Sequence, residues 1–472
     1  MLQYSVRHYF FAILLILCFF FLLRSETTGF IYALFFLFGI VTINFFRSNF
    51  YKGAYFVLLF SVTIAYFIRP LILVDHPDMF MYTKIASTTS VEDINRSLIY
   101  ALVSTACIAA GFIAVIKFTP DKIHLASSDS NFIMRKFFII NSIIIVLTLC
   151  KLFLIISMGV GIKGDEGRDS TFAFILKLLS PDLAFVVYYI YLTKYWKQLS
   201  LQKKALIFLM IALTSYSLFV TGSKTFIAMF GLCFFFNFIF KNRKIKLPAF
   251  ILVGIAGFVV LAFSFIVSAA VRYSSEKNLR SIVNTAQTFA SSESLLTVSN
   301  EITKRMMGLD GQIACYIITE QANPIVKYEL QQSFSPKDIT LHTLTNIIPK
   351  VSFISTPASG KVISETVVGK PEDVSHAGSL GLFASVYFMS GSYFFLFNLI
   401  LGALLAFYFI YARKIKNLDL QFIIYFLGCF FIMRTVLSGN FDVVLGEFIP
   451  KWALLYFYIK IISFVNPPAR YA

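Results

Sequence analysis

The segment Ala54–Val74, AYFVLLFSVTIAYFIRPLILV, decides the class of this protein, because it is long and apolar enough to cross a lipid bilayer. Its only charged residue is Arg69, near the end of the segment. Similar segments recur along the 472 residues, of which 58% are hydrophobic and only 14% charged. A soluble domain of this length would carry nearly twice that charge fraction. We therefore predict an all-α, polytopic membrane protein.

About twelve spanning helices are expected from the apolar segments. Their approximate ranges are 9–23, 30–46, 54–74, 98–117, 137–159, 172–193, 205–221, 225–240, 248–271, 393–412, 420–434 and 452–466. No small-residue cleavage site follows the first apolar run, so we interpret that run as a retained helix. The six cysteines show no spacing typical of a disulfide framework or a metal site.

Basic residues orient the predicted helices. Clusters of Lys and Arg fall in alternate short loops, around 47–52, 117–136, 194–204, 241–246 and 413–416. Acid-containing loops, such as 75–93 and 165–169, lie between them. Because basic loops face the cytoplasm, this alternation places both termini inside. It also explains most of the net charge of +17, so we expect no nucleic-acid partner.

One connection on the predicted outer side is unusually long. Residues 272–391 are mostly polar and are interrupted by five prolines. We therefore divide the chain into helices one to nine (1–271), a large, partly helical outer loop (272–391) and helices ten to twelve (392–472). The apolar stretch Ser379–Ser390 is too short to span, so we expect a half-helix or an interfacial helix there.

Six cations are expected at the outer level of the membrane, where basic residues are unusual. They are Arg69, Lys151, Lys177, Lys224, Arg272 and Arg434. Each alone is explained by a long side chain that reaches the interface. Together they predict an outward-facing basic cavity for an anionic lipid head group, such as a diphosphate. Lys224 follows Gly222 in a tight turn, at the N-terminus of the next predicted helix.

Acid–base candidates lie in the outer loop. His376 is expected at the membrane surface, where an imidazole is a plausible base near neutral pH. Asp310 and Glu301 are competing bases, because a desolvated carboxylate serves equally well. The alternative for His376 is an ordinary solvated loop histidine. We expect no metal and no cofactor, because no zinc-binding spacing is present.

In their order, several short motifs resemble the bacterial O-antigen polymerases of the Wzy type, also called oligosaccharide repeat unit polymerases. The motifs are Gly222-Ser223-Lys224, Arg305 before Gly308-Leu309-Asp310-Gly311, Ile348-Pro349-Lys350, Gly381-Leu382-Phe383 with Tyr387 and Gly391, and Leu401-Gly402. The match covers roughly residues 221–402. Two departures are lysine in place of arginine at Lys224 and Lys350, and the absence of a glutamate before Tyr387.

The resemblance implies a glycosyltransferase of the C class, which joins repeat units carried on undecaprenyl diphosphate at the periplasmic face of the bacterial inner membrane. Arg272, Arg305 and Arg434 would then bind diphosphates, and no metal would be needed. Membrane lipids and a chain-length regulator are the further partners implied. Two alternatives stay open: a lipid-linked oligosaccharide flippase and the related O-antigen ligase.

Overall fold

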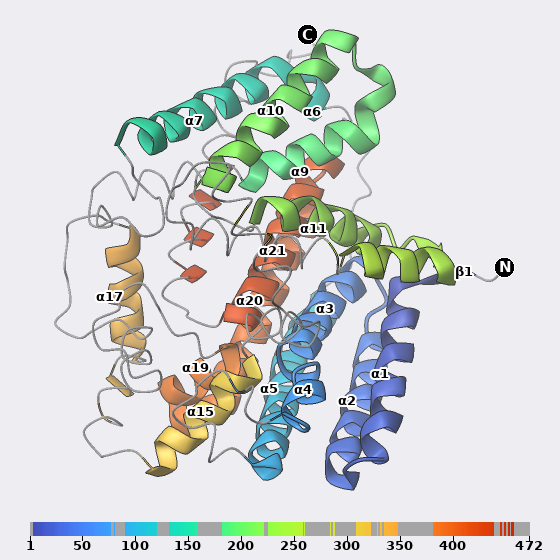
Figure 1. Ribbon diagram of the computed structural model, residues 1–472, viewed down its shortest axis with the longest axis vertical. Helices are drawn as coiled ribbons and strands as arrows, with labels where there is room; N and C mark the ends of the chain where they lie inside the picture. Colours follow the sequence, from blue (N-terminus) through green and yellow to red (C-terminus); the bar gives the residue numbers. More distant parts are fainter. Residues whose placement is uncertain are drawn as a thin grey trace.

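The architecture is taken from a computed structural model. It describes residues 3–76, 80, 90–119, 132–158, 182–220, 225–257, 259, 284, 287, 308–321, 328, 331–332, 335–347, 381–438, 444–445, 448–449, 452–453 and 455–456. This part of the chain is almost entirely helical (Figure 1). The predicted residues Lys177, Lys224, Arg272, Glu301, Arg305 and His376 lie outside it.

The first three helical segments form one side of the structure (Figure 1). Helices α1 (Val6–Leu22) and α2 (Glu26–Asn44) form an antiparallel pair. Ser25 begins α2 as its N-cap, and its side chain accepts a hydrogen bond from the Thr28 backbone N–H. The chain then runs without a break through α3 (Asn49–Val62), a π-helix (Thr63–Phe67) and the short α4 (Pro70–Leu73).

Helices α5 (Val91–Phe118) and α20 (Phe394–Lys414) pack along their lengths. Two glycines allow the backbones to touch. A Cβ atom on Gly402 would lie 2.0 Å from the carbonyl oxygen of Ile108, and one on Gly111 would lie 2.0 Å from that of Leu399. Small residues at such crossings are typical of helix pairs in membranes.

Two groups of helices lie at opposite ends of the structure (Figure 1). At one end lie α6 (Phe132–Arg135), α7 (Phe137–Met158), α9 (Asp182–Ile190) with the π-helix Tyr191–Tyr195 and the 3-10 helix Trp196–Gln198, and α10 (Leu201–Val220). At the other end lie α15 (Gly308–Gln321) and α19 (Leu382–Ser390) with the 3-10 helix Gly391–Tyr393. Helix α21 (Leu418–Ser438) packs against α3, against α9 at one end and against α15 and α19 at the other. Helices α11 (Thr225–Phe240), Leu247–Gly257 and α17 (Pro336–Ile347) complete the set.

The structure also contains a small sheet that the all-helical prediction missed. Strands β1 (Gln3–Ser5) and β2 (Lys244–Lys246) pair antiparallel, with Tyr4 opposite Ile245. Nearby, the Tyr9 hydroxyl donates to the Ile245 carbonyl at 2.9 Å. Three-residue strands carry too little sequence pattern to be distinguished from a loop.

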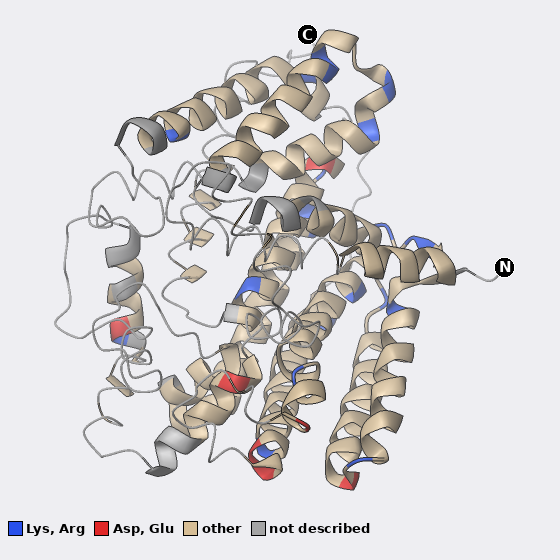
Figure 2. Ribbon diagram, viewed as in Figure 1, with Lys and Arg blue, Asp and Glu red and all other residues tan. Residues whose placement is uncertain are grey.

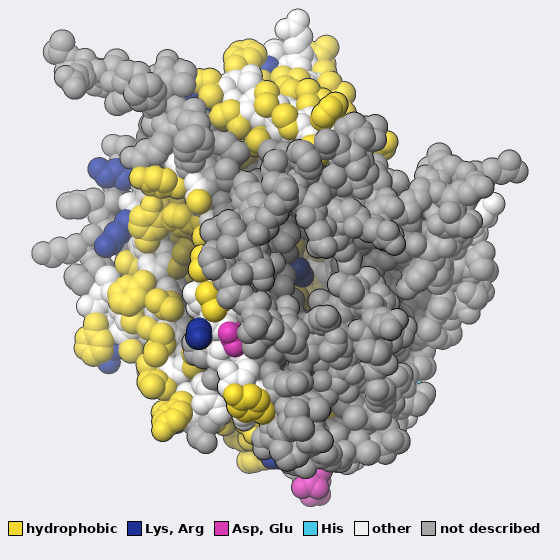
Figure 3. All heavy atoms as spheres, turned by 90° about the vertical axis from the view of Figure 1, so that its left-hand side faces the viewer, with side chains coloured by type: hydrophobic (Ala, Val, Ile, Leu, Met, Phe, Trp, Pro, Cys, Tyr) yellow, Lys and Arg dark blue, Asp and Glu magenta, His cyan; other side chains and the backbone are white. Residues whose placement is uncertain are grey.

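Six described helical segments are long and apolar enough to cross a membrane. They are Glu26–Asn44, Asn49–Leu73, Val91–Phe118, Phe137–Leu154, Phe394–Lys414 and Leu418–Leu437. Each coincides with a predicted span. Many of their large hydrophobic side chains are exposed, and hydrophobic side chains cover much of the described surface in Figure 3. The described part of the chain therefore has the architecture of an all-α membrane protein. Most of the predicted span 452–466 lies outside the described residues.

Charged residues collect at the ends of these helices (Figure 2). The first turns of α2 and α5 carry Glu26, Glu92 and Asp93, at the same end of the structure as α15 and α19 (Figures 1 and 2). The last turn of α20 carries Arg413 and Lys414 at the other end. By the positive-inside rule, the end with α15 and α19 is the predicted outer end.

Candidate functional site

A buried ion pair joins α15 to the end of the third helical segment. The guanidinium of Arg69 donates from Nε to Asp310 Oδ2 at 2.8 Å and from Nη2 to Asp310 Oδ1 at 3.4 Å. The exposed fractions of the two side chains are 1% and 0%. Two parallel hydrogen bonds fix both the distance and the plane of such a pair. The sequence predicted both as site residues but in separate roles, Arg69 as a cation that binds a diphosphate and Asp310 as a candidate base.

The π-helix Thr63–Phe67 sets the direction of Arg69. Here the backbone N–H of Ile68 donates to the carbonyl of Thr63 at 3.0 Å, five residues back instead of four. Pro70 then begins α4, and its ring has no N–H to donate. One wider turn rotates the following residues relative to an unbroken α-helix, and such bulges are frequent at functional sites.

Tyr66, in this π-helix, is the point where two distant segments meet. A Cβ atom on Gly308 would lie 2.7 Å from the Tyr66 ring. Gly381 has a φ of +79°, and a Cβ atom added to it would lie 2.7 Å from the Gly308 Cα and 3.1 Å from the Tyr66 hydroxyl oxygen, which is too close. That hydroxyl accepts a hydrogen bond from the Phe383 backbone N–H at 3.2 Å. The Gly308-Leu309-Asp310 and Gly381-Leu382-Phe383 stretches are thus adjacent.

Aromatic rings line the other side of α15. Tyr100 of α5, Tyr316 of α15 and Tyr387 of α19 lie with ring centroids 5.6–6.2 Å apart. The guanidinium of Arg96 lies 4.4 Å from the Tyr316 centroid, within range of a cation–π interaction. Burial raises the pKa of the Tyr316 phenol and of the adjacent Cys315 thiol, so both stay protonated at neutral pH and neither is suited to act as a base or nucleophile.

Three buried hydroxyl groups on α5 and α19 have no hydrogen-bond partner within the described part of the chain. They are those of Ser97, Tyr100 and Ser385. Leaving such a group unsatisfied costs about 1–3 kcal/mol. Ser97 and Tyr100 lie on α5, which packs on α15, and Ser385 lies on α19, which packs on both α15 and α5. A hydroxyl-rich ligand could satisfy both the donors and the acceptors.

The expected stretch Ser379–Ser390 contains helix α19, whose residues from Leu382 to Val386 are buried against neighbouring helices. The helix packs on α15, α20 and α21 as well as on α5. Its side chains therefore belong to the core of the predicted outer end.

Three of the six predicted cations, Arg69, Lys151 and Arg434, lie in the described part of the chain. Arg69 lies at the site, and Arg434 is exposed on α21, one turn before the end of that helix. Lys151 is buried, with 5% of its surface exposed, but its helix α7 packs on α10 at the opposite end of the structure from α15 (Figure 1). In the described part of the chain, Lys151 therefore lies away from Arg69.

A second buried carboxylate was missed by the sequence reasoning. Asp419, at the start of α21, accepts from Lys194 Nζ at 2.7 Å and from the Tyr195 hydroxyl at 2.6 Å. Asp419 follows the basic loop 413–416 and was not among the predicted site residues. It lies at the opposite end of α21 from α15, and we assign it to the structural framework.

Among the described residues, no group of three or more His, Cys, Asp or Glu side chains is arranged to hold a metal ion. Comparisons of the chain with family models, with curated proteins and with solved structures found no match.

Proposed function

We propose that this protein polymerises oligosaccharide repeat units carried on undecaprenyl diphosphate, at the periplasmic face of a bacterial inner membrane. The single observation that carries the proposal is the Arg69–Asp310 pair beside the Gly308–Tyr66–Gly381 contact. It supports the proposal because the two motifs that resemble the polymerases are far apart in sequence and adjacent in space. The buried hydroxyl groups without a partner on α5 and α19 suit a substrate rich in hydroxyl groups.

The proposed reaction needs cations and a base. The hydroxyl oxygen of the acceptor sugar attacks the anomeric carbon of the donor, and the bond from that carbon to the diphosphate oxygen breaks. Undecaprenyl diphosphate leaves with the electron pair, and a base takes the hydroxyl proton. Negative charge develops on the leaving diphosphate, and Arg272, Arg305 and Arg434 are the proposed residues that stabilise it. The enzyme is thus proposed to be a metal-independent membrane glycosyltransferase.

The geometry changes the role proposed for Asp310. Both of its oxygens accept hydrogen bonds from Arg69, which fixes the position and plane of the carboxylate. We therefore propose Asp310 as a positioning residue that fixes Arg69 and the start of α15. The base is then proposed to be His376 or Glu301.

A null strain tests the proposed function. Loss of a polymerase should leave single repeat units on the surface glycan, since one unit is still exported and attached. Loss of a flippase or a ligase should leave no units at all. Gel analysis of the surface glycan, with the full chain restored from a plasmid as control, separates these outcomes. A null strain that displays no single units, or that keeps normal long chains, would contradict the proposal.

A further inference from the structure

A basic turn, residues 241–246, joins α11 to helix Leu247–Gly257 at the predicted inner end of the structure. Four of its six residues are basic and exposed: Lys241, Arg243, Lys244 and Lys246. None of the four has an ion-pair partner among the described residues. The basic turn therefore presents a concentrated positive charge to its surroundings.

Contacts on both sides hold the basic turn in place. The Arg7 guanidinium of α1 donates to the side-chain oxygen of Asn242, a residue with a φ of +45°. The backbone N–H of Arg243 donates to the Phe238 carbonyl at 3.1 Å, where α11 ends. Strand β2, which includes Lys244 and Lys246, then pairs with β1. Charges fixed in this way lose little conformational freedom when they bind an anion.

The cations of the basic turn lie close enough to repel one another. Partial burial lowers the pKa of Lys241, and the charges of Arg243 and Lys194 lower it further. Asp419 acts on Lys241 in the opposite direction. Its two oxygens, however, already accept hydrogen bonds from Lys194 at 2.7 Å and from the Tyr195 hydroxyl at 2.6 Å. A phosphate, with several acceptor oxygens, would relieve the repulsion and bind several of the exposed donors.

Apolar surface lies directly beside the basic turn. Leu247, Ile251 and Leu252 of helix Leu247–Gly257 are 50%, 50% and 67% exposed. Cations next to an exposed apolar helix are the arrangement that binds an anionic lipid, since the phosphate meets the charges and the acyl chains meet the helix. A soluble phosphate would gain nothing from the helix. A zwitterionic lipid, whose ammonium offsets its own phosphate, would gain less from the basic turn.

We propose that the basic turn binds the phosphate of an anionic phospholipid in the predicted inner leaflet, with the acyl chains along helix Leu247–Gly257. The site lies at the opposite end of the structure from the Arg69–Asp310 pair, so this proposal does not depend on the proposed polymerase function. A lipid bound here would hold the inner ends of α1 and α11 to helix Leu247–Gly257.

Native mass spectrometry of the full chain, released from detergent micelles, tests the proposal by counting bound lipids. The probes are phosphatidylglycerol and phosphatidylcholine with the same acyl chains, so only the head group differs. We expect the protein to retain phosphatidylglycerol preferentially, and Lys241→Gln and Arg243→Gln each to weaken its binding roughly fivefold. Lys117→Gln is the matched control, because it removes an exposed charge from the last turn of α5, at the same predicted end. That variant should bind phosphatidylglycerol as the unmodified protein does.

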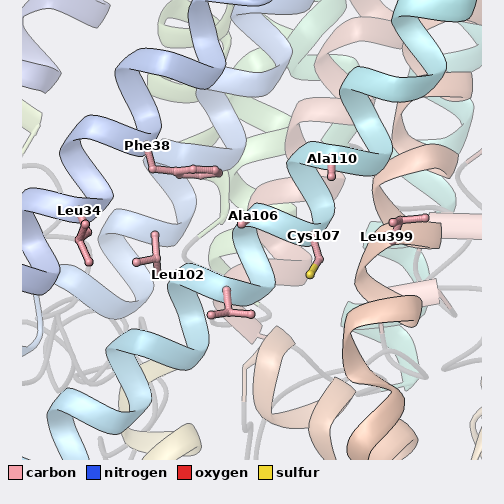
Figure 4. A pocket seen from close by; sticks show the side chains of 8 residues that line it. Leu34, Phe38, Leu102, Ala106, Cys107, Ala110 and Leu399 are labelled. Carbon is pink, nitrogen blue, oxygen red and sulfur yellow. The ribbon is translucent and has the colours of Figure 1, made fainter.

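Two further comparisons separate head-group binding from other contacts. An apolar groove between α2, α5 and α20 is lined by eight hydrophobic residues, one of them Ala106 (Figure 4). Ala106→Leu fills part of this groove without changing charge, so it should leave binding of phosphatidylglycerol unchanged. Excess inorganic phosphate should not displace the lipid, because it has no chains. Equal retention of the two lipids, an equal loss in Lys117→Gln, a loss in Ala106→Leu, or displacement by inorganic phosphate would overturn the proposal.

Discussion

At the scale of single residues, the buried Arg69–Asp310 pair is the most consequential feature of the end that contains α15 and α19. Removing one member of a buried pair leaves an unpaired charge and costs about 3–5 kcal/mol, whereas replacing both by apolar residues is often neutral. We therefore expect Asp310→Leu alone to destabilise the protein by that amount and Arg69→Met with Asp310→Leu to recover most of it. Thermal unfolding of detergent-purified protein measures both.

The exposed pair of Arg24 and Asp75 is the control for this experiment, because both side chains are more than two-fifths exposed. Asp75→Leu should change stability by no more than about 1 kcal/mol. If the double variant unfolds at the same temperature as Asp310→Leu alone, the pair contributes more to stability than the compensation of two charges. A stable double variant that forms no polymer would assign the pair to function.

The proposed diphosphate ligands give a second prediction. Arg272→Ala, Arg305→Ala and Arg434→Ala should each abolish polymer while the protein remains in the membrane, because the leaving group loses a cation where charge develops. Arg→Lys variants keep the charge but lose the two-pronged hydrogen bonding, so we expect partial activity from them. Glycan gels together with immunoblots of membranes measure the outcome. Normal polymer length in all three alanine variants would rule these residues out.

Glycine at position 381 gives a third prediction. Gly381 and Gly391 both have positive φ, +79° and +51°, so alanine is strained at either position. Only at Gly381 would the new Cβ also meet Gly308 and Tyr66, whereas nothing lies within 4 Å at Gly391. Gly381→Ala should therefore lower the unfolding temperature, and polymer yield, more than Gly391→Ala. Equal losses would show that the contact with Gly308 and Tyr66 is not needed.

At the scale of helices, the crossing of α5 and α20 depends on two glycines. Gly402→Ala should separate the helices, since its Cβ would lie 2.0 Å from the Ile108 carbonyl oxygen. Gly231→Ala in α11 is the control, because nothing lies within 4 Å of its Cβ and alanine favours a helix by about 1 kcal/mol. We expect the first variant to lose stability in detergent and the second to keep or gain it. A stable Gly402→Ala protein would contradict this packing.

Helices were the features that the sequence predicted best. Runs such as Phe394–Lys414 are apolar over most of their length, so the existence and the approximate ends of these helices follow from hydropathy. The site was predicted only in part. Arg69 and Asp310 stood out as a charge in an apolar segment and as part of a motif, but their pairing depends on the contact of α15 with the third helical segment. Tyr66 gave no signal, because a π-helix is not visible in hydrophobic periodicity.

At the scale of the whole molecule, the charge alternation predicts which end faces outward. In a background with the native cysteines replaced, Lys337→Cys on α17 should react in intact cells with a maleimide that crosses only the outer membrane. Lys416→Cys, between α20 and α21, should react only after the inner membrane is permeabilised. Both lysines are exposed, so accessibility differs only by side. The opposite labelling pattern would reverse the topology.

The pairing of β1 with β2 bears on the order in which the protein assembles. Ser5 pairs with Lys244, so the sheet closes a stretch of roughly 240 residues that already contains most of the described helices. During synthesis, β1 has no partner until β2 has left the ribosome, at translation speeds of roughly 5–20 residues per second. The two strands therefore join only after α1 to α11 have been made. Formation of this sheet, followed by hydrogen exchange at Tyr4, would mark a late step of folding.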